Sequence, residues 1–303
     1  MANLREIKKR INSVSTTQQI TRTMEMVATA KIARALSREK KSEAYRTAIT
    51  DVMLTVAGDT AAETNSPLLV DPEVYECALV IGISSDRGLA GGFNMQVDRA
   101  VEQRINHFHR HGAKRVELIT CGRKVSEHFA HYPDRVMHID GQSDDPSIEA
   151  ARAIANYVID GYARGDFGRV DIVYFHAKNR VEQVLRSERI LPLDEMVLRT
   201  ARGPRANEDE APKRLSSPFT FVPSAEHVLN RLIPSYVLTV IHQAMIDSAA
   251  AEQGARRKSM HSATENASAI IADLTRTYNR VRQASITTEI NEIVGGAAAL
   301  EEQ

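Results

Sequence analysis

Apolar side chains recur every three or four residues from the start of the chain. The first of them are Leu4, Ile7, Ile11 and Val14. This spacing is the seam of a two-helix coil. The next positions of this repeat are the polar residues Gln18 and Thr21, and the apolar stripe restarts at Met24 and Val27. Since no Pro or Gly precedes Gly58, the pattern predicts one helix over 3–57, roughly 80 Å long at 1.5 Å per residue.

A second long helix is predicted at the C-terminal end. From Ser235 to Val294 there is no proline, and Gly254 is the only glycine. Pro234 marks either a break or the first turn of a renewed helix. Residues spaced alternately by three and four form a seam along this helix, at Met260, Ala263, Ala267, Ile270, Leu274, Val281 and Ala284. Thr277 occupies the one polar position in this repeat. So narrow a seam suits a two-stranded coil better than the face of a globular core.

Between these helices the pattern changes to short apolar runs. Strands are expected at 77–84, 115–121, 136–139 and 170–176, with a possible edge strand within 181–193. Helical segments are expected at 95–111, 122–131 and 148–164. This alternation predicts an α/β domain with a mostly parallel sheet.

The predicted fold class is therefore α/β, in which a long antiparallel coiled coil of N- and C-terminal helices flanks a central Rossmann-like α/β domain. Helices of this length in one chain bury their seams against each other only if they lie antiparallel. The predicted segments are an N-terminal coiled-coil helix at 1–58, a central α/β domain at 75–195, a polar connector at 199–218 and a C-terminal coiled-coil helix at 223–303.

Composition narrows the function classes. Lys and Arg together number 39, as do Asp and Glu, although residues 1–50 hold eleven bases against four acids, a local net charge of +7. A solvated or partner-facing surface explains this basic stretch better than nucleic-acid binding. Cys77 and Cys121 lie in strand-like runs and are expected to be buried free thiols. With no signal peptide and no apolar run of about twenty residues, a soluble cytoplasmic-type protein is expected.

Chemical motifs are sparse. The stretch from Ser84 to Asn94 contains Gly88, Gly91 and Gly92 after a predicted strand, where a turn could hold phosphate. Its glycines match neither a P-loop nor G-x-G-x-x-G, so a tight loop with Asn94 as helix N-cap is favoured.

The histidines offer little more. His107 and His111 would share a helix face, where zinc is conceivable, but no third ligand is evident. We expect no catalytic residues, no metal and no cofactor.

Polar side chains near the end of the last helix stand among small residues. They are Arg282, Gln283, Thr287 and Glu289, with Ala284, Ser285 and the run from Gly295 to Ala299 around them. An ordinary solvated surface does not demand such small neighbours. The pattern predicts a slim shaft that presents polar contacts to surrounding protein.

Five segments resemble the γ subunit of F-type ATP synthases. They are Ile7–Ile11, Thr17–Thr21, Met24–Ala28, Ser85–Asn94, and the spaced residues Ile286, Thr287, Glu289, Glu292, Gly296, Ala297 and Ala299. Their order and spacing agree across nearly the whole chain. The insertion that carries a regulatory cysteine pair in chloroplast forms is absent, so the resemblance implies no thiol switch.

The resemblance implies a central rotary stalk of a proton-translocating ATP synthase. The coil would turn inside three α and three β subunits, and the base would bind the ε subunit and the membrane c-ring. The chain would not be catalytic alone, and it would lie at the cytoplasmic face of a bacterial plasma membrane as a peripheral protein. Two alternatives stay open, a nucleotide-binding α/β enzyme with helical arms and a coiled-coil structural adaptor.

The same resemblance implies particular contacts. Arg282, Gln283 and Thr287 would contact a loop of β, with Glu289 nearby, and Met24 on the opposing helix would lie in the same region. Arg22 and Lys31 would form a basic face turned towards acidic segments of β.

Overall fold

A computed structural model describes residues 4–60, 67–69, 72, 74–179, 181–193 and 225–301. The predicted connector at 199–218 and the expected helix entry at Pro223 and Ser224 lie outside these residues. Contacts divide the chain into two compact units. The first is Met1–Val27 with Arg257–Gln303, and the second is Ala28–Arg256.

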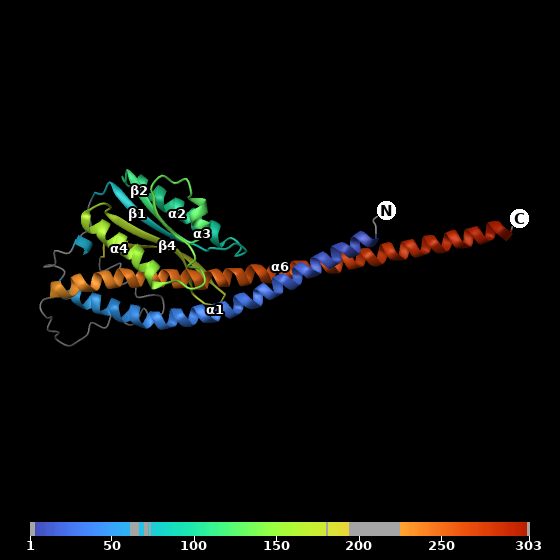
Figure 1. Cartoon of the computed structure of the whole chain (residues 1–303), viewed down its shortest axis with the longest axis horizontal. Coiled ribbons are helices and arrows are strands. Elements are labelled where there is room, and N and C mark those ends of the chain that lie inside the picture. Colours follow the sequence, from blue (N-terminus) through green and yellow to red (C-terminus); the bar gives the residue numbers. More distant parts are fainter. Residues whose placement is uncertain are drawn as a thin grey trace. The chain divides into compact units, whose positions relative to one another are not determined.

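Two helices contribute to both units. They are α1 (Leu4–Thr60) and α6 (Ala225–Glu301), drawn in blue and in orange to red in Figure 1. Pro234 lies inside α6, so the expectation of a break or a new start there was wrong. Pro234 removes one backbone N–H donor from the helix, and the turns on either side stay helical.

Within the first unit α1 and α6 run antiparallel, as predicted. An advance of seven residues along α1, from Gln18 to Glu25, is matched by a return of seven residues along α6, from Ser268 to His261. The contacts that show this are Gln18 Nε2 to Ser268 Oγ (2.7 Å), Thr21 Oγ1 with Thr264 Oγ1 (2.8 Å) and His261 Nδ1 with Glu25 Oε1 (3.0 Å).

The seam of α1 keeps one phase. Thr21 and Ala28 are buried and Gln18 is half-buried, whereas Val27 is 51% exposed. The predicted restart at Val27 was therefore wrong. Polar side chains occupy seam positions because they bond across the coil, and this hid the continuous 3–4 repeat from an analysis of apolar residues alone.

The predicted seam of α6 was one residue out of phase over part of its length. Ile270 is 50% exposed, while Ile271 is half-buried, and Ser285 rather than Ala284 is half-buried. The seam passes from Met260 through Thr264, which bonds Thr21. A threonine at this position breaks the apolar pattern but not the packing.

The second unit contains a five-stranded sheet in the order β3-β2-β1-β4-β5. Its strands are β1 (Cys77–Ile83), β2 (Arg115–Cys121), β3 (Arg135–Ile139), β4 (Arg169–Ala177) and β5 (Gln183–Leu191). All neighbours pair in parallel except β4 with β5. The predicted α/β class, its mostly parallel sheet and the edge strand are confirmed.

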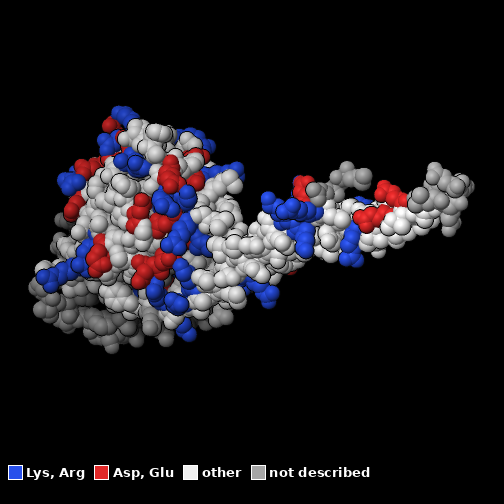
Figure 2. All heavy atoms as spheres, turned by 45° about the vertical axis from the view of Figure 1, so that its right-hand side comes forward, with Lys and Arg blue, Asp and Glu red and all other residues white. Residues whose placement is uncertain are grey.

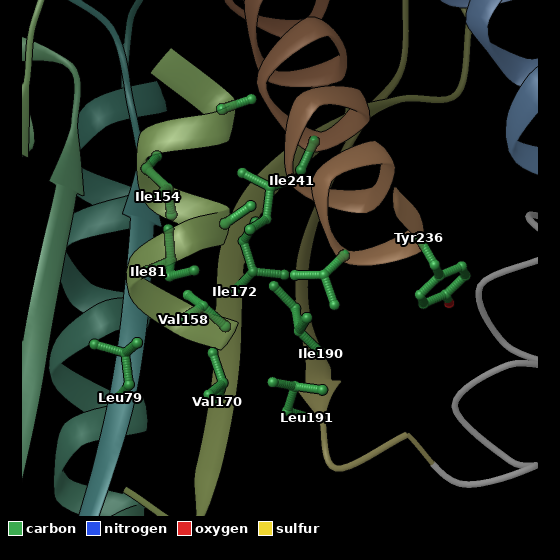
Figure 3. Close-up of a cluster of buried hydrophobic side chains, with 14 of the residues drawn as sticks. Leu79, Ile81, Ile154, Val158, Val170, Ile172, Ile190, Leu191, Tyr236 and Ile241 are labelled. Carbon is green, nitrogen blue, oxygen red and sulfur yellow. The ribbon is translucent and has the colours of Figure 1, made fainter. Parts of the chain in front are cut away.

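Helices cover both faces of this sheet. Those between strands are α2 (Phe93–Arg110), α3 (Arg123–His128) and α4 (Ile148–Arg164), and a 3-10 turn, η1, spans Pro67–Leu69. One apolar cluster joins the sheet to α4 and to parts of α1 and α6, and Figure 3 shows Ile172 of β4 among its members. The other joins the opposite face to α2 and to Ala250 and Ala251.

The alternation of side chains along β1 reflects the cover on both faces of the sheet. Leu79 and Ile81 point into the first cluster, whereas Ala78 and Val80 point into the second. A strand whose two faces are both covered is apolar at every position. The near-continuous run that predicted β1 therefore has a direct structural cause.

A buried carboxyl group on α2 makes the stability of the second unit depend on pH. Burial raises the pKa of Asp98 to about 6, an effect that His128 opposes and Glu102 strengthens. The Oδ1 atom of Asp98 is buried without a hydrogen-bond partner among the described residues. The folded state therefore holds a proton that the unfolded chain releases near pH 4, so stability falls as pH rises from about 4 to 6.

We expect Asp98→Asn to stabilise the protein at pH 7 by ~1–3 kcal/mol, because the amide needs no proton to stay neutral. Chemical denaturation at several pH values from 4 to 7 measures this. The gain should be large at pH 7 and nearly vanish at pH 4. A gain that is independent of pH, or a loss at pH 7, would refute the assignment.

Candidate partner-binding site

The C-terminal end of α6 extends beyond the part of the helix that packs against α1. The register that joins Thr21 to Thr264 places Leu4, the first described residue of α1, opposite about Val281. Beyond Ser285 every described side chain of α6 up to Gly295 is exposed. Its large apolar members are Ile286, Ile290, Ile293 and Val294.

These apolar residues follow helical spacing, so they form one stripe on the helix. Within the part of the chain that the structure describes, nothing packs on this stripe. Apolar side chains exposed in a row are typical of a surface that binds another protein. The stripe was not predicted, because the polar residues around it suggested polar contacts, although Ile286, Ile290 and Ile293 follow helical spacing in the sequence.

The predicted polar contacts flank the stripe. Arg282, Gln283, Thr287 and Glu289 are all exposed. Thr287 donates its hydroxyl hydrogen to the backbone carbonyl of Gln283 at 2.9 Å. Over the described residues, neither Arg282 nor Glu289 forms an ion pair. The structure therefore brings these four residues together on a surface of mixed character.

Met24 does not join them. Its neighbour Glu25 bonds His261, which precedes Arg282 by 21 positions. At 1.5 Å per residue this separates Met24 from Arg282 by roughly 30 Å along the coil. Met24 is half-buried beside the seam. The expectation that it shares a region with Arg282 was wrong, and any contact that it makes belongs to a different level of the coil.

The two predicted basic residues on α1 also differ. Arg22 is exposed, but Lys31 Nζ lies 2.6 Å from Asp144 Oδ1 in the second unit. This hydrogen bond from Lys31 lowers the pKa of Asp144. Lys31 therefore serves first to attach α1 to the loop before α4, as does Arg38, which lies 2.8 Å from Asp145.

The glycine-containing loop after β1 is held by internal hydrogen bonds. Asn94 does not cap α2, because the helix begins at Phe93 and Gly92 occupies the N-cap position. The Asn94 Oδ1 atom instead accepts hydrogen bonds from the backbone N–H of Ser85 (3.2 Å) and from the Ser85 hydroxyl (2.7 Å). The predicted capping role was wrong, and the side chain closes the loop on itself.

Asp86 fixes the same loop to its neighbours. Its carboxylate accepts hydrogen bonds at 3.0 Å from the backbone N–H groups of Arg123, Gly141 and Ser143. Burial raises the pKa of Asp86, but these donors outweigh it and hold the pKa below its ordinary value. A carboxylate directed at the backbone donors of this edge would oppose a phosphate there, so the nucleotide-binding alternative loses its support.

Arg256 attaches α6 to this loop within the second unit. Its guanidinium donates to the Gly88 carbonyl at 3.2 Å and pairs with Glu252 at 2.6 Å. Both side chains are buried. The loop that carries the glycines thus connects the sheet to α6.

The two histidines considered for zinc lie close together at the C-terminal end of α2, with His107 in its last turn and His111 as its C-cap. The rings of His107 and His111 have centroids 4.0 Å apart, and the ring of His111 bonds the backbone carbonyl of His107. No acidic or sulfur ligand joins them among the described residues. A different set does converge in the second unit, namely Glu39, His176 and Asp247.

Charge is unevenly distributed along the first unit. Figure 2 shows basic side chains gathered near the start of α1, where the sequence has Arg5, Lys8, Lys9 and Arg10. Figure 2 also shows acidic side chains among uncharged ones on the part of α6 beyond them. Among the described helices, none has a stretch both long and apolar enough to cross a membrane.

Comparisons with known proteins agree on one family. The family described as "ATP synthase" matches residues 3–300. The ATP synthase gamma chain of Heliobacterium modesticaldum is 37% identical over 301 residues, which cover 99% of this chain and 100% of the relative.

Solved structures share the fold. A chain of the Euglena gracilis mitochondrial ATP synthase, in an assembly described as OSCP/F1/c-ring, matches with a TM-score of 0.63 and 18% identity, covering 98% of this chain and 94% of that one. A chain of the Tetrahymena thermophila mitochondrial ATP synthase central stalk and c-ring matches with a TM-score of 0.59 and 22% identity, covering 80% and 99%. On its sequence and its fold, the chain belongs to the family of ATP synthase gamma chains.

Proposed function

We propose that this chain is the central rotary stalk subunit of a proton-translocating F-type ATP synthase. It couples rotation of a membrane c-ring to conformational change at catalytic β subunits, and it is not catalytic alone. The observation that carries the proposal is the end of α6, where an exposed apolar stripe and four exposed polar residues extend beyond the cover of α1.

The physical basis of coupling is a difference in contact energy. A shaft shifts the equilibrium of a neighbouring subunit only as far as its interaction energy differs between that subunit's states. Arg282 and Glu289 offer contacts of opposite sign close together. Contacts of this kind are weak enough to be remade at each angle.

We assign a partner subunit to each surface of the chain. Three α and three β subunits surround the coil, with Arg282, Gln283, Thr287 and Glu289 facing β. Met24 contacts β at its own level, roughly 30 Å away. The second unit binds the ε subunit and the c-ring, so the chain is peripheral at the cytoplasmic face of a bacterial plasma membrane.

Reconstitution tests this assignment. Purified α and β subunits are mixed with and without the chain, and ATP hydrolysis and the size of the assembly are measured. We expect a complex of three α, three β and one copy of the chain, whose hydrolysis depends on the chain. Hydrolysis by the chain alone would favour the enzyme alternative, and binding without any effect on hydrolysis would favour the adaptor.

Replacing the end-of-helix arginine tests the contact surface. We expect Arg282→Ala to lower ATP synthesis by about tenfold, because it removes one charge-assisted hydrogen bond worth roughly 1.5 kcal/mol. Proton-driven synthesis in vesicles that contain the whole complex measures this.

The matched control is Arg276→Ala on the same helix. Arg276 is also exposed and pairs with Asp273 at 3.3 Å, where α1 still accompanies α6. It should leave synthesis within about twofold, because an exposed pair contributes little. Equal losses in both variants would show that the contact is not confined to the end of α6.

A further inference from the structure

Three side chains with metal-binding atoms converge inside the second unit. They are Glu39 of α1, His176 of β4 and Asp247 of α6, and all three are buried. One ligand atom of each lies within 4.8 Å of the others. The His176 Nδ1 atom lies 2.8 Å from Asp247 Oδ2. A helix, a strand and a second helix thus meet at one polar cluster in the interior of the second unit.

The neighbouring turn of the coil holds this point in place. The Ser42 hydroxyl donates to Gln243 Oε1 and to the Glu39 carbonyl. Gln243 precedes Asp247 by one helical turn, as Glu39 precedes Ser42. The register of α1 against α6 is therefore fixed beside the cluster.

The cluster has an unsatisfied acceptor. Asp247 is 1% exposed, and its Oδ1 atom is buried with no hydrogen-bond partner among the described residues. A buried oxygen of this kind costs free energy unless a donor or an ion satisfies it. Because Asp247 already meets His176 through Oδ2, the free oxygen offers a second position for a cation.

The charge of the three side chains also favours a cation. Two carboxylates accompany one imidazole, so even a protonated His176 leaves the three side chains with a net negative charge. Arg186 interacts electrostatically with Asp247, but its guanidinium lies 3.2 Å from Glu188. A positive ion between the carboxylates would lower the cost of burying them.

We propose that Glu39, His176 and Asp247 form a binding site for a divalent transition metal, with Zn²⁺ the ion that fits the set best. One imidazole nitrogen and two carboxylate oxygens are ligands that zinc accepts at about 2.0–2.2 Å, with a fourth position for water. Tetrahedral geometry then requires ~3.4 Å between ligand atoms, which side-chain rotation supplies from the present spacing. Bound metal would fasten α1 and α6 to β4, independently of the proposed rotor function.

Titration of the full chain tests the site. The purified protein is stripped with a chelator and titrated with Zn²⁺ alone, with stoichiometry read by calorimetry and by elemental analysis. We expect one Zn²⁺ per chain and a higher midpoint of thermal unfolding, because an ion that binds only the folded state stabilises it. A chain that binds no Zn²⁺ at micromolar concentration would overturn the proposal.

Variants locate the bound ion. His176→Asn and Asp247→Asn should weaken Zn²⁺ binding by more than about 100-fold, since even residues behind the ligands change affinity by 10–100-fold. Glu39→Gln gives a third variant in case one of these fails to fold, and circular dichroism identifies those that do fold. Undiminished binding in a folded variant of any of the three residues would contradict the site.

The control is His107→Ala on the surface of α2, which removes the competing pair with His111. It should leave the stoichiometry and the affinity unchanged. Loss of the bound Zn²⁺ in this variant would assign the metal to the surface histidines and would overturn the proposal. Substitution with Co²⁺ adds a visible spectrum, which should change in His176→Asn and stay unchanged in His107→Ala.

Discussion

Replacing Gly122 by alanine is expected to prevent stable folding of the second unit. Gly122 joins β2 to α3 at a φ of +105°, in the region that favours glycine. A Cβ atom at this residue would lie 2.7 Å from the carbonyl carbon of Ser84 and closer still to its oxygen. The neighbouring atom is backbone and not the end of a flexible side chain, so it cannot rotate away.

The surrounding hydrogen bonds prevent relief by movement. The Ser84 N–H donates to the Cys121 carbonyl at 2.8 Å, and the Gly122 N–H donates to the Ile139 carbonyl at 2.7 Å. Moving either strand end would break bonds in the sheet. We expect a loss of at least ~4 kcal/mol, which is a large part of the stability of an ordinary domain.

Gly141→Ala is the matched control for this substitution. Gly141 also has a positive φ, +80°, but a Cβ there would have no atom within 4 Å. Only the conformational cost applies, about 1–2 kcal/mol. Denaturant unfolding monitored by circular dichroism compares the two. Similar losses in both variants would show that contact with Ser84 is not what restricts Gly122.

The second large effect is expected from Arg104→Ala. The guanidinium of Arg104 on α2 pairs with Asp171 of β4, whose side chain is fully buried. Burial raises the pKa of Asp171, and the Arg104 charge opposes this rise. Removing Arg104 leaves a buried carboxylate with less compensation, and breaking a buried pair in this way costs about 3–5 kcal/mol.

The double variant Arg104→Ala with Asp171→Asn separates this penalty from lost packing. Arg104 also stacks over the ring of Phe108 at 5.2 Å, a contact that both variants lose. The double variant should recover at least half of the lost stability, because the amide carries no charge to bury. The single variant should be closer to wild type at pH 4 than at pH 8, since low pH neutralises Asp171. No recovery in the double variant would assign the loss to packing alone.

The central sheet could be predicted from sequence because its strands are buried on both faces. Residues such as Leu79 and Val80 belong to nearly continuous apolar runs, and these runs identify the strands in the sequence. The predicted helix bounds also lie within a few residues of the observed ends of α2, Phe93 and Arg110. Local patterns sufficed wherever the local pattern was apolar.

The coil was harder, because part of its seam is polar. Thr21 and Thr264 bond each other across the helices, yet each breaks the apolar stripe of its own helix. The phase was consequently misassigned at Val27 and Ile270. Only the partner helix reveals that a threonine belongs to the seam, and the partner lies 243 residues away in the sequence.

The candidate surface could be predicted in part. Arg282 and Thr287 stood out among small residues, and the structure places both on the exposed end of α6. The separation of Met24 from them depends on helix register, which no pattern in one helix contains. The convergence of His176 with Asp247, which lie 71 positions apart, depends likewise on tertiary packing.

Direct observation of rotation tests the central claim of a rotor. An exposed residue of α2, Arg110, is replaced by cysteine and labelled with an optical probe in a complex with immobilised α and β subunits. Labelling is selective because burial raises the pKa of the Cys121 thiol to about 12 and also raises that of Cys77. Addition of ATP should drive the probe in one direction, with three steps per turn. A complex that hydrolyses ATP while the probe stays stationary would contradict the rotor.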